Sequence, residues 1–384
     1  MNAEKILEKF IKKGMDIGLE RVTKSISKFI DIKNPPFKII HIAGTNGKGT
    51  TANLLNNYFE KIGKRAGLFT SPHIESVTER IKIGSKEILE NELIEIIKKI
   101  EKDFCGKDLT YFEILNVAGL YYFLQEKVEF VILETGLGGR LDSTNATNKF
   151  LAIITHIDYD HINILGNDIL GIFKEKFAIC ENSSHFIIAP QKYDEINHFV
   201  QKIEDKRQEE FYKKELTNKP KAFEFNYSIF YSVVKFLSKN NLIKFDENIL
   251  EEMKNTQVLG RMNITKKDDF TIIKDVSHNL NGIENLVDYI QKNYQNKKFD
   301  IYFSALEDKN YVAMVNELSK IAEIIYFHPV NSIETQRFSV PFEKLISETN
   351  SKILREVKSL EDIKIKNDTI FCGSFYLISK VAKI

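Results

Sequence analysis

The feature that most constrains the fold is a regular alternation of short β-branched runs with longer amphipathic stretches. Residues 37–42 are mostly β-branched or aromatic, and they run into a turn of Gly, Asn and Thr followed by the helical pattern TANLLNNYFEKIG. Short apolar runs recur at residues 128–134, 150–157 and 185–190, separated by helical patterns. Buried strands that alternate with helices are typical of mostly parallel sheets covered on both faces. The first part of the chain is therefore predicted to be a doubly wound α/β domain.

The same alternation starts again in the last third of the chain. After QVLGRMNITKKDD come the runs TIIKDV, FDIYFSAL, AEIIYFHPV and DTIFCGSFYL. A chain of 384 residues exceeds one ordinary hydrophobic core, so two domains are expected. We place the boundary between residues 261 and 268, which gives a first domain over residues 1–264 and a smaller α/β domain over residues 265–384.

Composition excludes several classes of protein. The 55 basic and 54 acidic residues leave a net charge of +1, so no field is available to attract nucleic acid. The three cysteines, Cys105, Cys180 and Cys372, lack the short spacings of a disulfide framework or a thiolate metal site. The N-terminus is charged throughout, and no later segment reaches the ~18 apolar residues of a membrane helix. We expect a cytoplasmic protein whose partners include neither nucleic acid nor membrane.

The turn after the first strand has the residue types of a phosphate loop. Glycines between a strand and a helix let backbone N–H groups crowd around an anion, and the helix N-terminus adds its positive dipole end. Lys48 can reach the outer phosphates as a point charge, and Thr50 or Thr51 can offer a hydroxyl to Mg²⁺. The residues predicted to bind ATP are Gly44, Thr45, Asn46, Gly47, Lys48, Gly49, Thr50 and Thr51.

This loop departs from the strict Walker A pattern. That pattern requires Gly six residues before the lysine and Ser or Thr directly after it, whereas this chain has Ile42 and Gly49 there. GxxGK alone is compatible with an ordinary glycine turn. The strand before it, the helix after it and the hydroxyl pair at the helix start favour a variant phosphate site.

The string HIAGTNGKGTT resembles the ATP loop of the Mur-ligase superfamily, and specifically of its dihydrofolate synthase and folylpolyglutamate synthase branch. Further blocks similar to that branch follow in the family's order: DIGLERV, LFTSPH, TERIKI, TYFE, LETGLGGRLDSTN, ITHIDYDHINILG, FKEKFAI, LGRMN, DVSHN and GSFYL. The resemblance covers essentially the whole chain. It implies a P-loop domain of the Mur ligase central type with a mostly parallel sheet, followed by a smaller Rossmann-like C-terminal domain.

The resemblance also implies two Mg²⁺ sites. Thr50 belongs to the first, while Ser71, Glu134 and His161 bind the second. Glu134 ends an apolar run at the expected carboxyl edge of the sheet, where ligands of open α/β sheets collect. From the residues alone, Ser71 could instead cap a turn before Pro72, Glu134 could be solvated, and His161 could be a hydrogen-bonded loop residue.

Lys176 matches a lysine that the family carbamylates, which turns an ammonium into a carboxylate able to support the metal region. An ordinary lysine on an amphipathic helix is the alternative for this residue. With Lys48 and His161, it completes the set of residues assigned to catalysis.

In the second half, Arg261 and Asp275 resemble the family's ATP contacts, on phosphate or base and on ribose respectively. Asn226 matches its adenine-side asparagine, in a weak flanking pattern. The segment DVSHNL departs from the usual DGAHNP block at Val276, Ser277 and Leu280. The residues retained from that block are Asp275, His278 and Asn279.

The family's bifunctional bacterial members place two blocks against dihydropteroate, and both are present here. The substrate-binding residues implied are Thr110, Tyr111, Phe112, Glu113, Leu141, Asp142, Ser143 and His278. The resemblance thus implies an ATP-dependent ligase that adds L-glutamate to dihydropteroate and to reduced folates through an acyl phosphate, and it implies a monomer.

Two alternatives differ in class. A UDP-muramoyl peptide ligase would share the loop and the chemistry, but only about forty residues precede Gly44, too few for a UDP-binding domain. A P-loop regulatory ATPase would hydrolyse ATP without forming an amide, and the TYFE and GLGGRLDSTN blocks would then serve packing alone. ATP turnover that persists without glutamate or a pterin acid would favour the latter.

Overall fold

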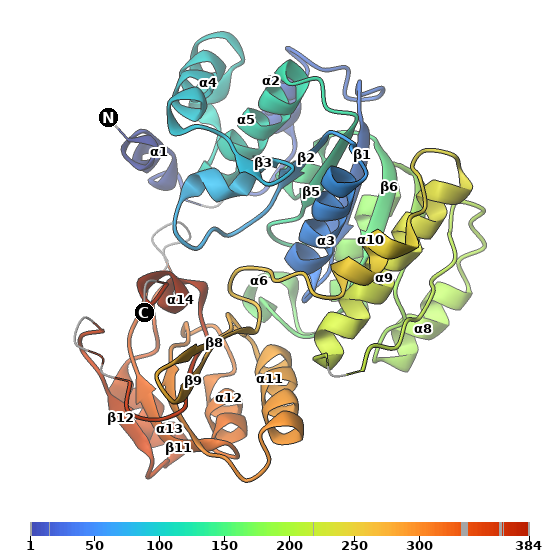
Figure 1. The fold of residues 1–384 in the computed structure, drawn as a ribbon. Coiled ribbons are helices and arrows are strands. Elements are labelled where there is room, and N and C mark those ends of the chain that lie inside the picture. Colours follow the sequence, from blue (N-terminus) through green and yellow to red (C-terminus); the bar gives the residue numbers. More distant parts are fainter. Residues whose placement is uncertain are drawn as a thin grey trace. The chain divides into compact units, whose positions relative to one another are not determined.

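The computed structural model describes residues 2–14, 16–217, 219–331, 337–360, 363 and 365–382. The chain divides into two compact units: a first unit of Met1–Lys219 and Phe223–Thr256, and a second unit of Pro220–Ala222 and Gln257–Ile384 (Figure 1). Among the described residues, no helix combines the length and apolar character that crossing a membrane needs.

The first unit is built on a seven-stranded sheet in the order β4-β3-β2-β5-β1-β6-β7. Strands β2, β5, β1, β6 and β7 run parallel, and β3 pairs antiparallel with both β2 and β4. The strands are β1 (Lys38–Ala43), β2 (Ala66–Phe69), β3 (Ile81–Ile83), β4 (Lys86–Glu87), β5 (Phe130–Glu134), β6 (Lys149–Ile154) and β7 (Ser183–Ile188). The strand runs predicted around residues 40, 131, 153 and 187 are thus confirmed.

Both faces of this sheet are covered, as the continuous apolar character of its strands requires. On β1, Ile40 and Ile42 pack with α3 and α9 on one face, and Ile39 packs in the cluster on the other. The helices are α1 (Ala3–Ile11), α2 (Glu20–Ile26), α3 (Lys48–Lys61), α4 (Glu90–Asp103), α5 (Tyr111–Gln125), α6 (Ile162–Leu165), α7 (Ile169–Phe177), α8 (Asp194–Gln201), α9 (Lys221–Lys239) and α10 (Glu247–Met253). Four 3₁₀ turns lie between them: η1 (Val77–Arg80), η2 (Gly106–Asp108), η3 (Ser143–Ala146) and η4 (Ala178–Cys180).

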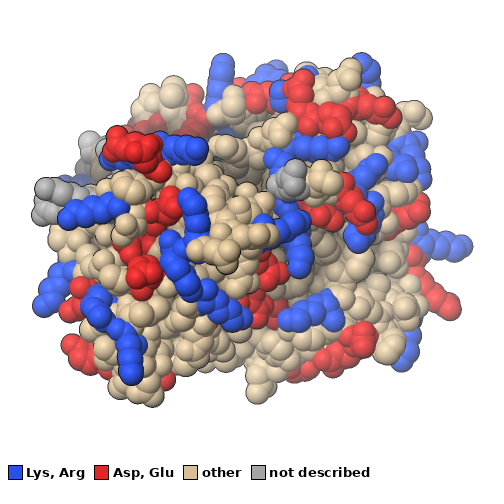
Figure 2. Space-filling model, turned by 60° about the horizontal axis from the view of Figure 1, so that its bottom comes forward, with Lys and Arg blue, Asp and Glu red and all other residues tan. Residues whose placement is uncertain are grey.

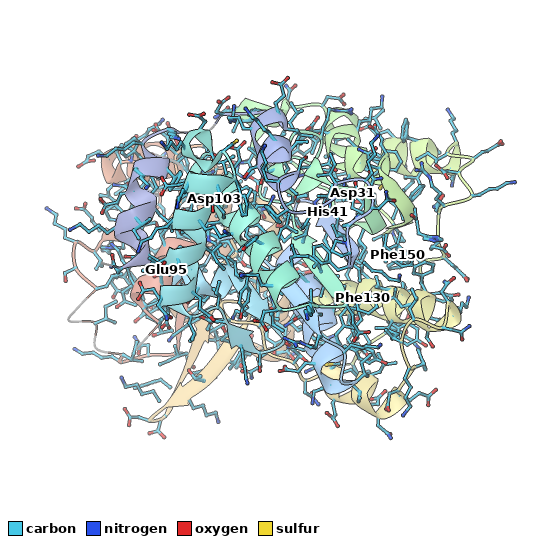
Figure 3. The ribbon with its side chains drawn as sticks, turned by 90° about the horizontal axis from the view of Figure 1, so that it is seen from above. Asp31, His41, Glu95, Asp103, Phe130 and Phe150 are labelled. Atoms are coloured by element: carbon cyan, nitrogen blue, oxygen red, sulfur yellow. The ribbon has the colours of Figure 1, made fainter. Side chains whose placement is uncertain are left out.

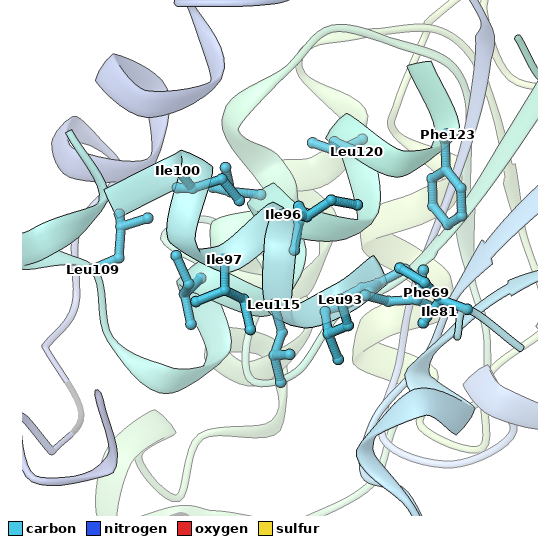
Figure 4. Close-up of a cluster of buried hydrophobic side chains, with 14 of the residues drawn as sticks. Phe69, Ile81, Leu93, Ile96, Ile97, Ile100, Leu109, Leu115, Leu120 and Phe123 are labelled. Carbon is cyan, nitrogen blue, oxygen red and sulfur yellow. The ribbon is translucent and has the colours of Figure 1, made fainter. Parts of the chain in front are cut away.

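Helices α4 and α5 show how the pattern becomes packing (Figure 4). In α4, Leu93, Ile96, Ile97 and Ile100 recur at helical spacing, so one stripe is buried while the opposite face carries charge. That stripe joins the buried cluster containing Phe69 of β2. Helix α5 is apolar on nearly all sides because it is enclosed between α4 and the sheet.

The two edges of the first sheet end differently. Strand β4 has only two residues, Lys86 and Glu87, both charged and exposed. Beside β7, the Phe186 N–H donates to the Arg207 carbonyl at 2.8 Å, and the Glu209 N–H donates to the Phe186 carbonyl at 2.7 Å. The irregular segment around residue 208 therefore occupies that edge.

The second unit contains a six-stranded sheet in the order β12-β11-β10-β13-β9-β8, parallel except for the antiparallel pair of β8 and β9. Its strands are β8 (Asn263–Lys267), β9 (Phe270–Lys274), β10 (Phe299–Phe303), β11 (Ala322–Phe327), β12 (Leu354–Glu356) and β13 (Thr369–Cys372). Its helices are α11 (Leu280–Asn293), α12 (Tyr311–Leu318), α13 (Phe342–Thr349) and α14 (Phe375–Lys380). The predicted α/β class with mostly parallel sheets is confirmed in both units.

Candidate functional site

The loop between β1 and α3 adopts a backbone that needs its glycines. Gly47 directly precedes α3 at φ 92°, in the left-handed region. A Cβ there would overlap the Asn226 side chain, and a Cβ on Gly44 would overlap the Thr155 side chain. Two neighbouring elements therefore close on the loop at positions where only glycine fits.

The start of the loop is anchored to the carboxyl end of β6. The N–H groups of Thr45 and Asn46 donate to the His156 carbonyl at 2.8 and 3.3 Å. In the other direction, the Thr155 hydroxyl donates to the Asn46 carbonyl at 2.8 Å, and the Thr45 hydroxyl donates to the Asp158 carbonyl at 2.9 Å. The first N–H groups of α3 follow directly, and helix geometry gives these no carbonyl partner within the helix. This arrangement suits an anion.

Two lysines border the loop. The Lys48 ammonium donates to the carbonyls of Gly44 and Thr45 at 3.0 and 3.2 Å, which holds it over its own loop. Lys176 is buried on α7, and burial, with the nearby charge of Lys48 as the second cause, lowers its pKa to about 7. A Cβ on Gly139 would lie 2.9 Å from the Lys176 Cα, so the GLGGR segment packs directly on this turn of α7.

Glu134 lies at the end of β5, buried beside the start of α3. Its Oε2 accepts the Ser71 N–H at 3.1 Å, and a Cβ on Gly49 would lie 3.3 Å from that oxygen. Thr50, the next residue of α3, is also buried. The structure thus gathers Ser71, Glu134 and the first turn of α3 in one place.

His161 directly precedes the short helix α6 at φ 51°, and its Nε2 lies 3.9 Å from the Asp160 carboxylate. In the part of the chain that the structure describes, no group of three His, Cys, Asp or Glu side chains could hold a metal ion alone. A site with few protein ligands suits Mg²⁺, which takes one or two carboxylates or hydroxyls and completes its shell with water and phosphate oxygens.

The predicted block Thr110 to Glu113 forms the start of α5. The Thr110 side chain caps this helix, and the Glu113 carboxylate accepts the Thr110 N–H at 2.7 Å. The same carboxylate pairs with Arg21 at 3.1 Å. The Tyr111 ring lies 5.3 Å from the Arg80 guanidinium, and a Cβ on Gly136 would lie 2.7 Å from the ring of Phe112.

The second predicted block, Leu141 to Ser143, leads into η3. Asp142 is buried and accepts the N–H groups of Leu137 and Thr144 at 2.8 and 3.0 Å. Burial raises the pKa of Asp142, and its hydrogen bonds with Thr144 and Leu137 oppose that rise. The Ser143 carbonyl accepts the Asn116 amide of α5 at 2.9 Å, which ties the two blocks together, while Leu141 is 45% exposed.

Asn226 was assigned to the adenine side by resemblance. It is buried on α9, and its side chain is the neighbour that Gly47 leaves room for. Its observed position is therefore against the phosphate loop.

In the second unit, Asp275 follows β9 and organises the loop before α11. Its carboxylate accepts the N–H groups of Met262 and Ser277 at 2.7 and 2.8 Å. The Arg261 guanidinium and the His278 ring both lie against Phe375 at the start of α14, at 5.2 and 5.5 Å from its ring centre. The structure thus brings Arg261, Asp275 and His278 into one neighbourhood of this unit.

The departures from the usual DGAHNP block fit this loop. The Ser277 hydroxyl hydrogen bonds with the Asp275 carboxylate and lies 3.1 Å from the Gly282 carbonyl, and Val276 is fully buried. Asn279 caps α11 by accepting the Gly282 N–H at 2.9 Å. Leu280 is therefore the first helical residue, a position that also suits the family's usual proline. With all three departures present, Asp275 still accepts from the backbone and Asn279 still caps α11.

Sequence reasoning missed four residues that support the site: Arg21, His41, Thr144 and Lys149. Arg21 pairs with Glu113, and Lys149 is a buried lysine that donates to the Asn145 carbonyl at 3.3 Å. The available signal for His41 was a lone histidine inside an otherwise apolar strand.

On the face shown in Figure 2, charges of both signs are mixed. Figure 2 shows basic and acidic side chains intermingled over one face, in keeping with the net charge of +1. The described site therefore owes its electrostatics to local groups such as Lys48 and the start of α3.

Comparison with known proteins gives consistent matches. The Mur ligase middle domain family matches residues 42–265. The dihydrofolate synthase/folylpolyglutamate synthase of Buchnera aphidicola subsp. Schizaphis graminum is 30% identical over 415 residues, covering 99% of this chain and 95% of that protein. The protein of that name from Bacillus subtilis is 29% identical over 422 residues, covering 97% and 96%.

Among solved structures, the bifunctional folylpolyglutamate synthase/dihydrofolate synthase of Yersinia pestis, complexed with AMPPNP and Mn ion, has a TM-score of 0.78 at 27% identity. The alignment covers 96% of this chain and 93% of that one.

Proposed function

The chain belongs to the dihydrofolate synthase/folylpolyglutamate synthase family of Mur ligases, and from this membership we propose that it joins L-glutamate to dihydropteroate and to reduced folates at the expense of ATP. It is an ATP-dependent ligase. The observation that carries the choice of substrate is the junction of two blocks in the first unit: the Asn116 amide joins the helix headed by Thr110 to the segment that holds Asp142.

The phosphates of ATP would bind at the start of α3. The loop offers backbone N–H groups beside a helix N-terminus, and Lys48 is already held over it by two carbonyls. In this proposal Asn226 supports the loop through Gly47. Arg261 and Asp275, in the second unit, remain predicted nucleotide contacts. The Asp275 carboxylate is an acceptor suited to ribose hydroxyls, and the Arg261 guanidinium suits phosphate or base.

The residues at this place fit Mg²⁺. Thr50 would supply a hydroxyl at one site, and Ser71, Glu134 and His161 would supply the ligands at a second. When bound, Mg²⁺ neutralises part of the charge on the β- and γ-phosphates. The placement of the Glu134 carboxylate between the Ser71 backbone and Gly49 supports this assignment.

Lys176 would act as a carbamate. Its burial lowers the pKa of the amine to about 7, so a large fraction is neutral near neutral pH and able to attack carbon dioxide. The attack forms an N–C bond and releases a proton, leaving a carboxylate in place of an ammonium. This exchange would also remove the repulsion between Lys176 and Lys48.

The reaction activates a poor acyl donor. The pterin acid's carboxylate oxygen attacks the γ-phosphorus of ATP, the bond to the β-phosphate oxygen breaks, and an acyl phosphate and ADP form. The α-amine of glutamate then attacks the acyl carbon, and phosphate leaves from the tetrahedral intermediate as the amide forms. Lys48 stabilises charge that develops on the transferred phosphoryl group.

Release of ADP tests the proposal directly. The purified chain is assayed with dihydropteroate and with tetrahydrofolate, each with and without L-glutamate. ADP release that needs both a pterin acid and glutamate is the expected result. If neither dihydropteroate nor tetrahydrofolate supports ADP release, the folate assignment is wrong. Full-rate release without glutamate would identify an ATPase instead of a ligase. A protein active on only one acid would retain the ligase assignment and lose the bifunctional one.

A further inference from the structure

Three buried side chains form a continuous chain from β1 to the substrate-binding block. His41 lies in the middle of β1, fully buried in the interior of the first unit (Figure 3). Its Nε2 lies 2.7 Å from the Thr144 hydroxyl, and that hydroxyl lies 2.5 Å from the Asp142 carboxylate. The proposed reaction assigns no role to His41 or Thr144.

The hydrogens in this chain have one consistent arrangement. A threonine hydroxyl carries a single hydrogen, and the short distance to a carboxylate assigns that hydrogen to the bond with Asp142. The Thr144 oxygen must then accept from His41, so Nε2 of the ring carries the proton. The other ring nitrogen, Nδ1, is buried without a hydrogen-bond partner among the described residues. Burial, and secondarily the charge of Lys149, lowers the pKa of His41, in keeping with a neutral ring.

The backbone of η3 is fixed by other contacts. Asn116 donates to the Ser143 carbonyl, and Lys149 donates to the Asn145 carbonyl. His41 contributes neither of these bonds. Its hydrogen bond acts on the Thr144 hydroxyl alone, and so on the direction in which that hydroxyl faces the Asp142 carboxylate.

We propose that His41 is a positioning residue for the pterin acid: through the Thr144 hydroxyl it completes the set of donors that orients the Asp142 carboxylate. This inference rests on the proposed role of Asp142 in binding the acid. Without the His41 N–H, the Thr144 hydroxyl is free to rotate away, and Asp142 loses a donor that holds one of its two oxygens. The backbone N–H groups of Leu137 and Thr144 remain, one on each oxygen, so the Thr144 hydroxyl is the third donor to this carboxylate and the one that His41 controls.

His41 also occupies a particular place in the chain, three residues before Gly44. Strand β1, which leads into the phosphate loop, thus also carries the side chain that acts on Asp142. The two functions are separable, because His41 makes its hydrogen bond with Thr144, whereas the loop is anchored by Thr155 and His156.

The test compares His41→Leu, which removes the donor, with His41→Gln, which keeps an N–H near the position of Nε2. His41→Leu removes the hydrogen bond to Thr144, which in turn contacts the Asp142 carboxylate. This loss is expected to raise the KM for dihydropteroate about tenfold. A tenfold change in KM corresponds to about 1.4 kcal/mol. The KM for ATP is expected to stay within about twofold, because Thr155 and His156, and not His41, anchor the phosphate loop. His41→Gln recovers most of the loss. A purely structural role would not produce this split between the two substrates.

Thr144 supplies a second, independent pair. Thr144→Val breaks the chain and is expected to match His41→Leu, whereas Thr144→Ser keeps the hydroxyl and stays close to the natural protein. The double variant His41→Leu/Thr144→Val is no worse than either single variant, because both remove the same contact. If the His41 variants fail to fold, the Val and Ser variants at position 144 decide the question.

Three results would overturn the proposal: additive losses in the double variant, equal changes in the KM for ATP and for dihydropteroate, or Thr144→Ser as impaired as Thr144→Val. These outcomes are distinct from a failure of the proposed function. If the natural chain shows no turnover with either pterin acid, the folate assignment itself is wrong. If it turns over and the variants bind the acid normally, only the positioning role of His41 is lost.

Discussion

The loops that follow β1 and β9 occupy equivalent places, at the carboxyl ends of parallel strands in the two units, yet they are held in opposite ways. The loop after β1 has glycines at its tight points and takes its anchors from outside, at Thr155 and His156. The loop after β9 is held from within by a carboxylate, because Asp275 accepts the N–H groups of Met262 and Ser277.

Under the proposed function, this difference follows from what each loop binds. A loop for an anion must leave N–H groups available at its helix end, so here its start is fixed by carbonyls and hydroxyls from outside the loop. A loop that offers an acceptor to ribose can use that same acceptor to fix its backbone. The first therefore depends on glycine, whereas the second tolerates Ser277 and Leu280 in place of the usual residues.

The largest effect is expected from Lys48, the lysine held over the anion loop. Lys48→Met removes the charge held over Gly44 and Thr45, and kcat should fall by roughly a hundredfold to a thousandfold, as when one transition-state donor is lost. The matched control is Lys98→Met, which removes an exposed lysine of α4 that is paired with Glu95. Steady-state ADP release measures both, and equal activities would show that Lys48 has no role in phosphoryl transfer.

The dependence on glycine is tested by two substitutions at positive φ. Gly47→Ala places a methyl group against Asn226, whereas Gly63→Ala, at φ +74°, meets no atom within 4 Å. Both should lose about 1 kcal/mol of unfolding free energy from backbone strain. Gly47→Ala should in addition raise the KM for ATP by about tenfold or more, about 1.4 kcal/mol of lost binding.

Asn226→Ala provides the internal check on that crowding. Combined with Gly47→Ala it removes the atoms that the new methyl group meets. Partial recovery of ATP binding in the double variant is expected. No recovery would place the defect in the backbone strain of Gly47 alone.

The carboxylate that holds the second loop should matter to stability as well as to binding. Asp275→Ala leaves the Met262 and Ser277 N–H groups without their acceptor, at about 1–3 kcal/mol for each that stays buried. Denaturant unfolding followed by fluorescence or circular dichroism should show a destabilised second transition or a lowered midpoint.

Ser277→Ala is the matched control for Asp275, because it restores the residue usual in the family and removes only the hydroxyl contacts. Its cost should stay within about 1 kcal/mol. A loss as large as that of Asp275→Ala would show that the hydroxyl, and not the carboxylate, holds this loop.

The last prediction concerns the pH dependence of stability and the buried Lys149 next to the substrate-binding block. Burial lowers the pKa of Lys149 from 10.5 to about 8. Between these values the unfolded chain binds a proton that the folded chain lacks, so the free energy of unfolding contributed by this group rises with pH from about 8 to 10.5. Lys149→Met should flatten that part of the stability–pH curve, measured by denaturant unfolding at several pH values. An unchanged slope would contradict the lowered pKa.

Sequence reasoning recovered the elements that depend on local pattern. The strand, loop and helix around Gly44 to Lys61 and the apolar runs of both sheets carry their periodicity in the sequence, and Glu134 was placed correctly at a strand end. The roles assigned to individual site residues remain predictions.

What the sequence could not supply are the contacts made by residues far apart in the chain. His41 and Thr144 are 103 residues apart, and Arg21 and Glu113 are 92 residues apart. Neither pair has a spacing rule, because strand order and crossover connections bring them together. The position of Asn226 against Gly47 depends likewise on how α9 packs on the sheet, which its own helical pattern does not encode.

The way the first sheet ends has a consequence for association between copies of the chain. An open strand edge is a template for another chain, and long flat edges are where β-sheet proteins aggregate. Here one edge is a two-residue strand of opposite charges, Lys86 and Glu87, and the other is occupied by the backbone around Gln208. Another strand would have to displace native hydrogen bonds at one side or pair with charged residues over a very short length at the other. The sheet that carries the phosphate loop is thus protected against edge-to-edge polymerisation without the help of a partner subunit.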